Sequence, residues 1–235
     1  MFEEIGRIYD ALVVSETPKL PEVAFQYTDF VLWERERLAV QDMEPSLNYW
    51  RYHLAGGTFR LDLPIAHRRP LEQTYPGRNQ PLHFSPELIA GLRALSQREN
   101  ATLFMTLTAG FKLLLFRYTG QTDITLGTSL ANRSRPELQG MLGFLITMLV
   151  LHTEISGEIT FAELLHRLRR VLLDAYAHQD VPFTKLLEVA QLDRDWSRNP
   201  LFQFSFIFLS EEGAAEGLKS LEMIPSRIRF AKLQI

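Results

Sequence analysis

Apolar residues recur at helical spacing near the start of the chain and again further along. The spacing predicts an amphipathic helix over residues 1–14, with apolar positions at Phe2, Ile5, Ile8, Tyr9 and Leu12. It predicts further helices over residues 27–37, 46–54 and 85–98. The last of these opens with Ser85-Pro86-Glu87, which combines an N-cap serine, a proline in the first turn and an acid near the helix N-terminus.

Two longer helices are predicted in the middle of the chain. Residues 101–118 are apolar nearly all round, which is typical of a helix buried between layers, and Gly120 is expected to end it. The second helix opens with Thr160-Phe161-Ala162-Glu163, a capping box. Its apolar stripe comprises Phe161, Leu164, Leu165, Leu168, Val171, Leu172 and Ala175.

Three segments read as strands. Residues 123–129 and 147–155 are rich in threonine and aliphatic residues, and residues 202–209 alternate with period two, which places four phenylalanines on one face. Residues 61–81 contain four prolines and predict an extended connector, and residues 131–137 predict a polar loop. Helices that alternate with strands favour an α/β fold, a two-layer sandwich.

Composition narrows the possible functions. With 46% hydrophobic and 23% charged residues, the 235-residue chain is long enough for one large domain or two small ones. The net charge of −3 argues against a nucleic-acid partner, and the absence of cysteine excludes disulfides, zinc–thiolate sites and a thiol nucleophile. The longest mostly apolar stretch, residues 141–151, is too short to span a membrane, and the N-terminus lacks signal-peptide features. These features favour a cytoplasmic protein.

Two strings near the C-terminal end carry the most information. They are His178-Gln179-Asp180-Val181-Pro182-Phe183 and Arg194-Asp195-Trp196-Ser197-Arg198-Asn199-Pro200-Leu201. They resemble the late motifs of the condensation domain of nonribosomal peptide synthetases, in order and spacing. Upstream matches in the same order include Tyr27-Thr28-Asp29-Phe30-Val31-Leu32-Trp33, Tyr49-Trp50, Leu61-Asp62-Leu63-Pro64, Thr102 to Met105, Arg117 to Ile124, and Ala131 to Glu137.

One motif departs from the family pattern, which is usually written Gly-x-Phe-Val-Asn-Thr. After Gly143-Phe144, this chain has Thr147 where the family has asparagine, Met148 where it has threonine, and His152 where it commonly has arginine. A threonine hydroxyl differs from a carboxamide in its hydrogen-bonding capacity.

The resemblance implies a fold similar to chloramphenicol acetyltransferase, in which two related lobes meet at the active site. On this basis residues 1–55 are expected to form the end of the first lobe and the inter-lobe segment, and residues 56–235 the C-terminal lobe. The family's catalytic His-His-x-x-x-Asp-Gly occurs nowhere in the sequence, and Phe230-Ala231-Lys232-Leu233 resembles a motif that the family continues beyond. The chain is therefore expected to be a fragment, incomplete at both ends.

The implied function is a part in amide bond formation between carrier-bound acyl or peptidyl thioesters and aminoacyl thioesters. No cofactor is expected to bind directly, but the partner acyl or peptidyl carrier domains would bear phosphopantetheine. The missing first lobe would be the other partner. Without its catalytic histidine, the chain alone is expected to be inactive.

The resemblance points to seven positions along the substrate tunnel or in structural motifs. They are Thr147, His178, Asp180, Arg194, Asp195, Arg198 and Asn199. Residue by residue, structural roles are favoured. His178 is expected in a structural role such as bonding a backbone carbonyl, and Arg194, Asp195 and Arg198 are expected to pin a loop whose turn is set by Asn199-Pro200.

Two other functions remain open. The chain could be a non-catalytic module that docks a carrier protein or a neighbouring domain, which Thr147 in place of asparagine mildly favours. It could also be a different acyltransferase that uses His178. Histidine pairs at helical metal-binding spacing, a glycine-rich phosphate loop and a Gly-x-Ser-x-Gly elbow are all absent from the sequence.

Overall fold

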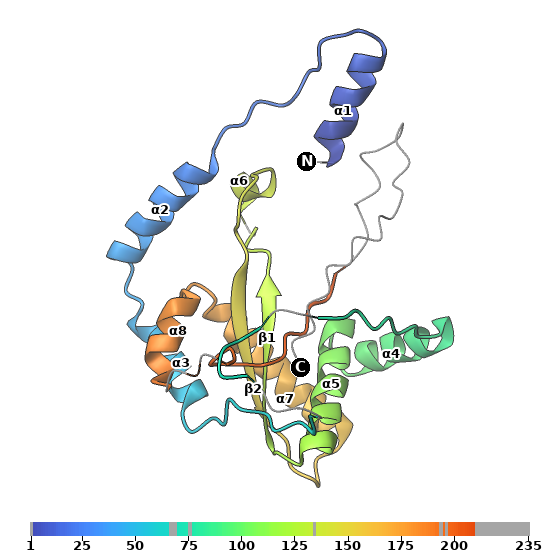
Figure 1. Ribbon diagram of the computed structural model, residues 1–235, viewed down its shortest axis with the longest axis vertical. Helices are drawn as coiled ribbons and strands as arrows, with labels where there is room; N and C mark the ends of the chain where they lie inside the picture. The colour runs from blue at the N-terminus through green and yellow to red at the C-terminus, as the bar shows by residue number, and fades with distance from the viewer. Residues whose placement is uncertain are drawn as a thin grey trace. The chain divides into compact units, whose positions relative to one another are not determined.

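A computed structural model describes residues 2–65, 70–74, 77–133, 135–192, 195 and 197–209. Its elements (Figure 1) are α1 Phe2–Val13, α2 Tyr27–Val40, α3 Glu44–Leu54, α4 Pro86–Arg98, α5 Leu103–Thr119, β1 Asp123–Leu130, α6 Pro136–Gln139, β2 Thr147–Glu154, α7 Phe161–Ala177 and α8 Phe183–Ala190. They fall into two compact units. The helical unit holds the described residues among 1–41, 132–145 and 208–228, and the sheet unit holds those among 42–131 and 146–207.

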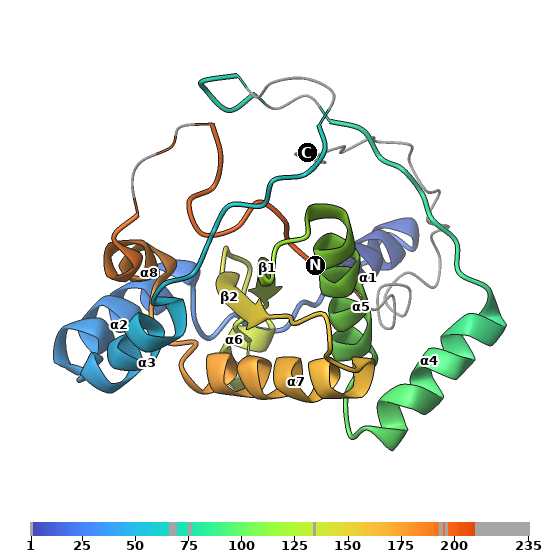
Figure 2. The same cartoon turned by 90° about the horizontal axis from the view of Figure 1, so that it is seen from below.

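The sheet unit is built on an antiparallel pair of strands, β1 and β2. Asp123 lies opposite Glu154 at one end of the register, and Leu130 lies opposite Thr147 at the other. Helices α5 and α7 pack together on one face of this pair, as Figure 2 shows. Side chains alternate between the two faces of a strand, so the face toward α5 and α7 carries the buried Ile124, Leu126, Leu151 and Thr153.

Local sequence signals set the ends of both long helices, as predicted. The Thr160 hydroxyl accepts from Glu163 N at 3.3 Å, and Glu163 Oε2 accepts in return from Thr160 N at 2.8 Å. Gly120 ends α5 in the left-handed conformation, with φ of 69°. The prediction that α5 is buried all round is partly wrong, because Leu114 remains 49% exposed.

Residues 202–209 do not form the predicted strand. One parallel bridge joins Ser205 to Gly127 of β1, through Gly127 N donating to Phe204 O at 2.8 Å and Phe206 N donating to Gly127 O at 2.9 Å. Gly127 is required at this close approach, because a Cβ there would lie 2.4 Å from the Phe202 ring. The Phe204 and Phe206 rings pack against Phe111 of α5, whereas Phe208 is 47% exposed.

Two helices were not predicted from the sequence. The four-residue α6 begins within the predicted polar loop of residues 131–137 and ends two residues beyond it, at Gln139. Helix α8 follows Val181-Pro182, with Pro182 at its N-cap. Helix α8 buries Leu186 and packs against α3 and β2.

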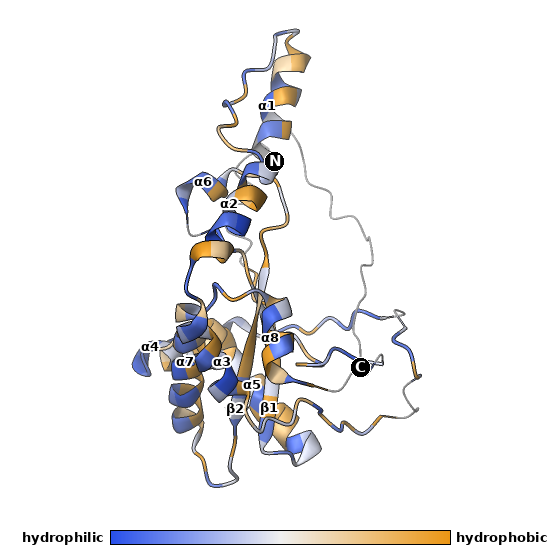
Figure 3. Cartoon of the chain, turned by 90° about the vertical axis from the view of Figure 1, so that its left-hand side faces the viewer, coloured by the Kyte–Doolittle hydropathy of each residue, from blue (hydrophilic) through white to orange (hydrophobic). Residues whose placement is uncertain are grey.

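The helical unit contains α1, α2 and α6. Figure 3 shows hydrophobic and hydrophilic residues sharing α1, as its amphipathic pattern predicts. The Tyr27 ring of α2 lies so close to Gly143 that a Cβ there would be 2.3 Å away, and its hydroxyl donates to Phe144 O at 3.2 Å. Among the described residues, no helix is long and apolar enough to cross a membrane.

Candidate functional site

His178 lies at the C-cap of α7 and is tied to α3 by three separate contacts. Its Nδ1 is 3.0 Å from the Ser46 hydroxyl, and its backbone carbonyl accepts from Trp50 Nε1 at 3.0 Å. Its ring stacks on Tyr49, with 4.2 Å between centroids and 19° between planes. Trp50 itself is fully buried. These contacts join the end of one helix to the side of another, which is what a structural histidine does.

The described residues of the late motif, Asp195 and 197–199, are held by their own side chains. Asp195 Oδ1 accepts from Ser197 N at 2.9 Å, and Asp195 Oδ2 pairs with Arg198 Nε at 2.6 Å. Hydrogen bonds from Ser197, and then the Arg198 charge, lower the pKa of Asp195. Asn199 Oδ1 accepts from Leu201 N at 3.1 Å, which sets the turn before the buried Leu201.

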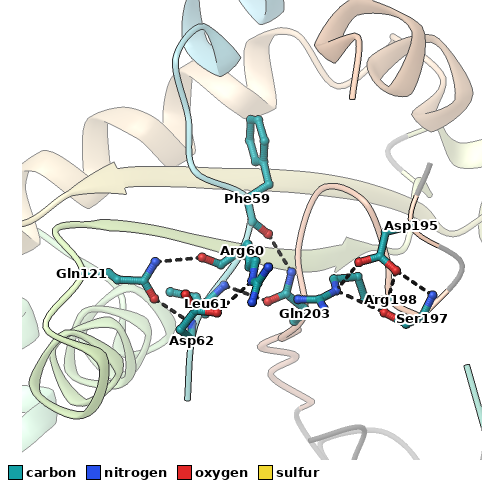
Figure 4. Close-up of polar contacts among 9 residues, drawn as sticks. All are labelled: Phe59, Arg60, Leu61, Asp62, Gln121, Asp195, Ser197, Arg198 and Gln203. Carbon is teal, nitrogen blue, oxygen red and sulfur yellow. Dashed lines mark hydrogen bonds and ion pairs between the residues drawn. The ribbon is translucent and has the colours of Figure 1, made fainter. Parts of the chain in front are cut away.

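Two glutamine side chains form hydrogen bonds with the backbone of residues 59–62, as Figure 4 shows. Gln203 accepts from Leu61 N at 2.8 Å and donates to Phe59 O at 2.7 Å. Gln121 accepts from Asp62 N at 2.7 Å and donates to Arg60 O at 2.8 Å. Each carboxamide thus satisfies one donor and one acceptor of the extended segment. We call these two pairs of bonds the glutamine clamp.

Sequence reasoning missed a fully buried lysine on α5. Lys112 Nζ donates to Leu151 O at 2.6 Å, Ile124 O at 2.7 Å and Thr153 Oγ1 at 2.9 Å. Three acceptors match the three donors of an ammonium group, while burial lowers the pKa of Lys112 well below its usual value. The available signal was a single cation within the apolar stretch Leu103–Phe116.

A second missed cluster lies on the opposite face of the same strands. His152 Nδ1 is 3.0 Å from the His53 carbonyl oxygen, and His152 Nε2 is 2.5 Å from Asp123 Oδ1. The other carboxylate oxygen of Asp123 accepts from Thr58 N. Burial, then the nearby charges of His152 and Lys112, lower the pKa of His53 to about 4. The cluster ties α3, through the His53 carbonyl, and the Thr58 backbone to the sheet.

The remaining predicted positions are spread through the sheet unit. Thr147 is the first residue of β2, opposite Leu130, and Asp180 is exposed just before the buried Val181. Within the described residues, no hydrogen bond or ion pair joins Thr147, His178 and Arg198 to one another. Arg194 and the segment Phe230–Leu233 lie outside the described residues.

The helical unit has a hollow of its own, of about 260 Å³. It is lined mainly by Phe25, Phe30, Trp33, Leu138 and Met141, with Asp29, Arg135 and Glu137 at its polar positions. The Arg135 guanidinium lies 4.5 Å from the Trp33 ring centroid, a cation–π contact. Among the described residues, no group of three or more acids and histidines is placed to hold a metal ion.

Comparison with known protein families identifies the family of this chain. The family described as Condensation domain matches residues 1–232. The chain belongs to the condensation domain family. It is 44% identical over 225 residues to one component of the linear gramicidin synthase of Brevibacillus parabrevis, covering 96% of this chain and 4% of that protein. The chain therefore spans a small part of the length of this multidomain relative.

Solved structures show the same fold. The X-domain from teicoplanin biosynthesis, seen alone and in a complex with OxyB, matches 87% of this condensation-domain chain and 46% of its own, with TM-score 0.78 and 27% identity. A four-domain nonribosomal peptide synthetase, holo-AB3403, shows the same fold at TM-score 0.77 and 23% identity, over 91% of this chain and 16% of its own. The predicted α/β fold, similar to chloramphenicol acetyltransferase, is confirmed.

Proposed function

We propose that this chain takes part in amide bond formation in nonribosomal peptide synthesis. The observation that carries the proposal is the condensation-domain match over residues 1–232, together with 44% identity to a linear gramicidin synthase component. The reaction would join an acyl or peptidyl thioester to an aminoacyl amine, with both substrates held on carrier domains through phosphopantetheine. Such a synthetase would work in the cytoplasm.

The chain would supply the framework of the reaction site rather than its proton-handling histidine. Attack of an amine on a thioester needs a group that positions or deprotonates the amine and donors that stabilise the oxyanion. None of the six histidines lies in a His-His pair. His178 is committed to Ser46, Tyr49 and Trp50, so a segment carrying His-His-x-x-x-Asp-Gly would provide the catalytic group.

In this proposal the seven predicted site positions either line the substrate tunnel or belong to structural motifs around it. The bonded residues Asp195, Arg198 and Asn199, with Ser197, would present a fixed wall, and His178 would hold the end of α7 against α3. Thr147 would contribute at the start of β2, and Asp180 before α8. Residues 1–55 would close the first lobe, and residues 56–235 would form the second.

A single-turnover amide assay tests the proposal. Donor-loaded and acceptor-loaded carrier proteins would be mixed with the chain alone, and with the chain plus a separately expressed segment that carries the His-His motif. Product is expected only from the second mixture. Product from the chain alone would contradict the proposal, and so would a second mixture that gives none although both carriers bind.

One observation favours a second function, a non-catalytic docking module. The X-domain from teicoplanin biosynthesis, a structural neighbour of this chain, has been solved in a complex with OxyB. A docking module would bind a carrier or a neighbouring protein with no product in either mixture. Binding measured by isothermal titration beside the amide assay separates the two functions.

A further inference from the structure

The hollow of the helical unit has a buried apolar floor and exposed aromatic walls. The floor comprises Phe30, Leu138 and Met141, which are 7%, 7% and 5% exposed. The walls are formed by Phe25 and Trp33, which are 50% and 36% exposed and can therefore contact a ligand that enters from solvent. The Phe30 and Trp33 rings lie 5.9 Å apart between centroids. Such a concave apolar surface favours a ligand with an apolar, ring-sized body.

Hydrogen bonds hold both sides of this hollow in place. On the α6 side, Arg133 Nη1 donates to Met141 O at 2.8 Å and also to Leu138 O. On the α2 side, Asp29 Oδ2 accepts from Gln26 N at 2.8 Å, which fixes the first turn of the helix. A ligand would therefore meet a site that is already formed, and would lose little affinity to ordering it.

Three charged side chains line the hollow, and two of them are carboxylates. The positive one, Arg135, is the N-cap residue of α6, and its guanidinium lies over the Trp33 ring. Within the part of the chain that the structure describes, this guanidinium forms no hydrogen bond or ion pair, so it is not paired with Asp29 or Glu137. The two carboxylates therefore leave an excess of negative charge beside aromatic faces, which favours a cation.

The charges and the apolar surface together select a class of ligand. An ammonium group is attracted both to carboxylates and to aromatic faces. A ligand carboxylate would find the donors of Arg135 but would be repelled by Asp29 and Glu137. A benzene ring joined to an amine by a short chain offers an apolar body for the floor and a cation for the carboxylates, within a volume of about 260 Å³.

We propose that the hollow between α2 and α6 is a binding site for an arylalkylamine. The ring of the ligand would lie on the apolar floor, and its ammonium group would lie at Asp29 and Glu137. The site goes beyond the proposed function, because it concerns the binding of a small molecule and holds whether or not the chain forms amides. Arg135, which occupies a face of Trp33, would oppose the ligand cation and reduce its affinity.

Titration of the full ¹⁵N-labelled chain with three matched probes, followed by nuclear magnetic resonance, tests the site. Phenethylamine carries an ammonium group at about pH 7, 2-phenylethanol is its neutral isostere, and 3-phenylpropionate is the corresponding anion. Phenethylamine is expected to bind with a dissociation constant on the order of 1 mM, about tenfold more tightly than either of the other two probes. The shifts should appear at the Trp33 indole N–H and at the backbone amides of Leu138 and Met141, which line the hollow.

Four substitutions assign the charge preference to named side chains. Glu137→Gln and Asp29→Asn should each weaken phenethylamine binding about threefold and leave 2-phenylethanol binding unchanged. The asparagine keeps an oxygen that can accept from Gln26 N. Arg135→Gln removes the opposing cation and should strengthen phenethylamine binding about threefold. Glu36→Gln lies on the same helix but not in the lining of the hollow, so as the matched control it should leave all three affinities unchanged.

Three results would overturn the proposal. Tighter binding of 3-phenylpropionate than of phenethylamine, lost in Arg135→Gln, would show an anion site instead. Equal affinities for the three probes would show an apolar hollow without charge selection, and no binding by any of them would show that the hollow is not a site for this class. Because Glu137 is exposed, Glu137→Gln is expected to fold, and it decides the charge preference even if Asp29→Asn does not fold.

Discussion

The ring of Tyr49 stacks on the ring of His178, which places a motif histidine of the condensation family in a helix–helix contact. The same Tyr49 ring also stacks on the ring of His53, with 5.4 Å between centroids. His178 thus belongs to a group of stacked rings at α3. A residue used in this way contributes to stability through packing and hydrogen bonding.

Replacing His178 with alanine tests that role. His178→Ala removes the bond to Ser46 and the stack on Tyr49, and should lower the free energy of unfolding by about 2 kcal/mol. His166→Ala is the matched control, because His166 is exposed and its pair with Glu99 should contribute less than about 1 kcal/mol. Urea unfolding of the wild type, His178→Ala and His166→Ala measures both changes in the free energy of unfolding. Equal stability of His178→Ala and wild type would contradict the structural role.

The glutamine clamp gives a prediction for single amides. Gln203→Leu removes the acceptor of Leu61 N–H, and Gln121→Leu removes the acceptor of Asp62 N–H. Each change should speed hydrogen exchange at its own amide and leave the other amide protected, at a cost of about 1–3 kcal/mol for the part-buried Gln203 site. Each variant is thus the control for the other. Exchange that accelerates at both amides in both variants would show that the segment detaches as a whole.

Gly127 and Gly110 offer a matched pair of glycine substitutions. Gly127→Ala would place a Cβ 2.4 Å from the Phe202 ring and should destabilise the chain by about 1–3 kcal/mol. Gly110→Ala meets nothing within 4 Å on the exposed side of α5 and should stabilise it by about 0.5–1 kcal/mol. Thermal unfolding measures whether each substitution raises or lowers stability. A Gly127→Ala variant as stable as the wild type would mean that residues 202–206 do not approach β1 as described.

Lys112 should make stability depend on pH. Burial lowers the pKa of Lys112 from an ordinary value of 10.5, so the unfolded chain holds this proton more firmly than the folded one. The free energy of unfolding should therefore rise, through this group, as pH rises from below the folded pKa toward the ordinary value. Lys112→Met should remove that rise while keeping most of the side-chain volume.

Urea unfolding of the wild type and Lys112→Met at about pH 6 and about pH 9 measures the effect. The free energy of unfolding of the wild type, relative to that of Lys112→Met, should be higher at about pH 9 than at about pH 6. A difference that is the same at both pH values would show that the lysine keeps its full charge in both states. Lys112→Ala, which also leaves a cavity, should cost about 3 kcal/mol or more.

Local signals in the sequence predicted much of the secondary structure. The capping box at Thr160, the glycine stop at Gly120 and the start at Ser85 act within one helical turn, and the structure confirms all three. The strand predicted over residues 202–209 was wrong, because a strand needs a partner along its length and β1 offers this segment one bridge.

The buried contacts of Lys112 and His152 could not be predicted from the sequence, because they join segments that lie far apart along the chain. Lys112 meets Leu151 across 39 residues, and His152 meets the His53 carbonyl across 99. The sequence marks each residue as unusual, a cation in an apolar helix and a histidine at a position where the family commonly has arginine. It does not say what faces them. The assignment of residues 1–55 and 56–235 to two lobes stays a prediction.

The most direct test of the account uses the reconstituted single-turnover amide assay with one change. In the supplied segment, the second histidine of the His-His motif is replaced with alanine, while all six histidines of this chain are left intact. The account predicts that product formation is lost, because this chain provides framework and not the catalytic group. Product formed at an undiminished rate would contradict it and would place the catalytic group within these 235 residues.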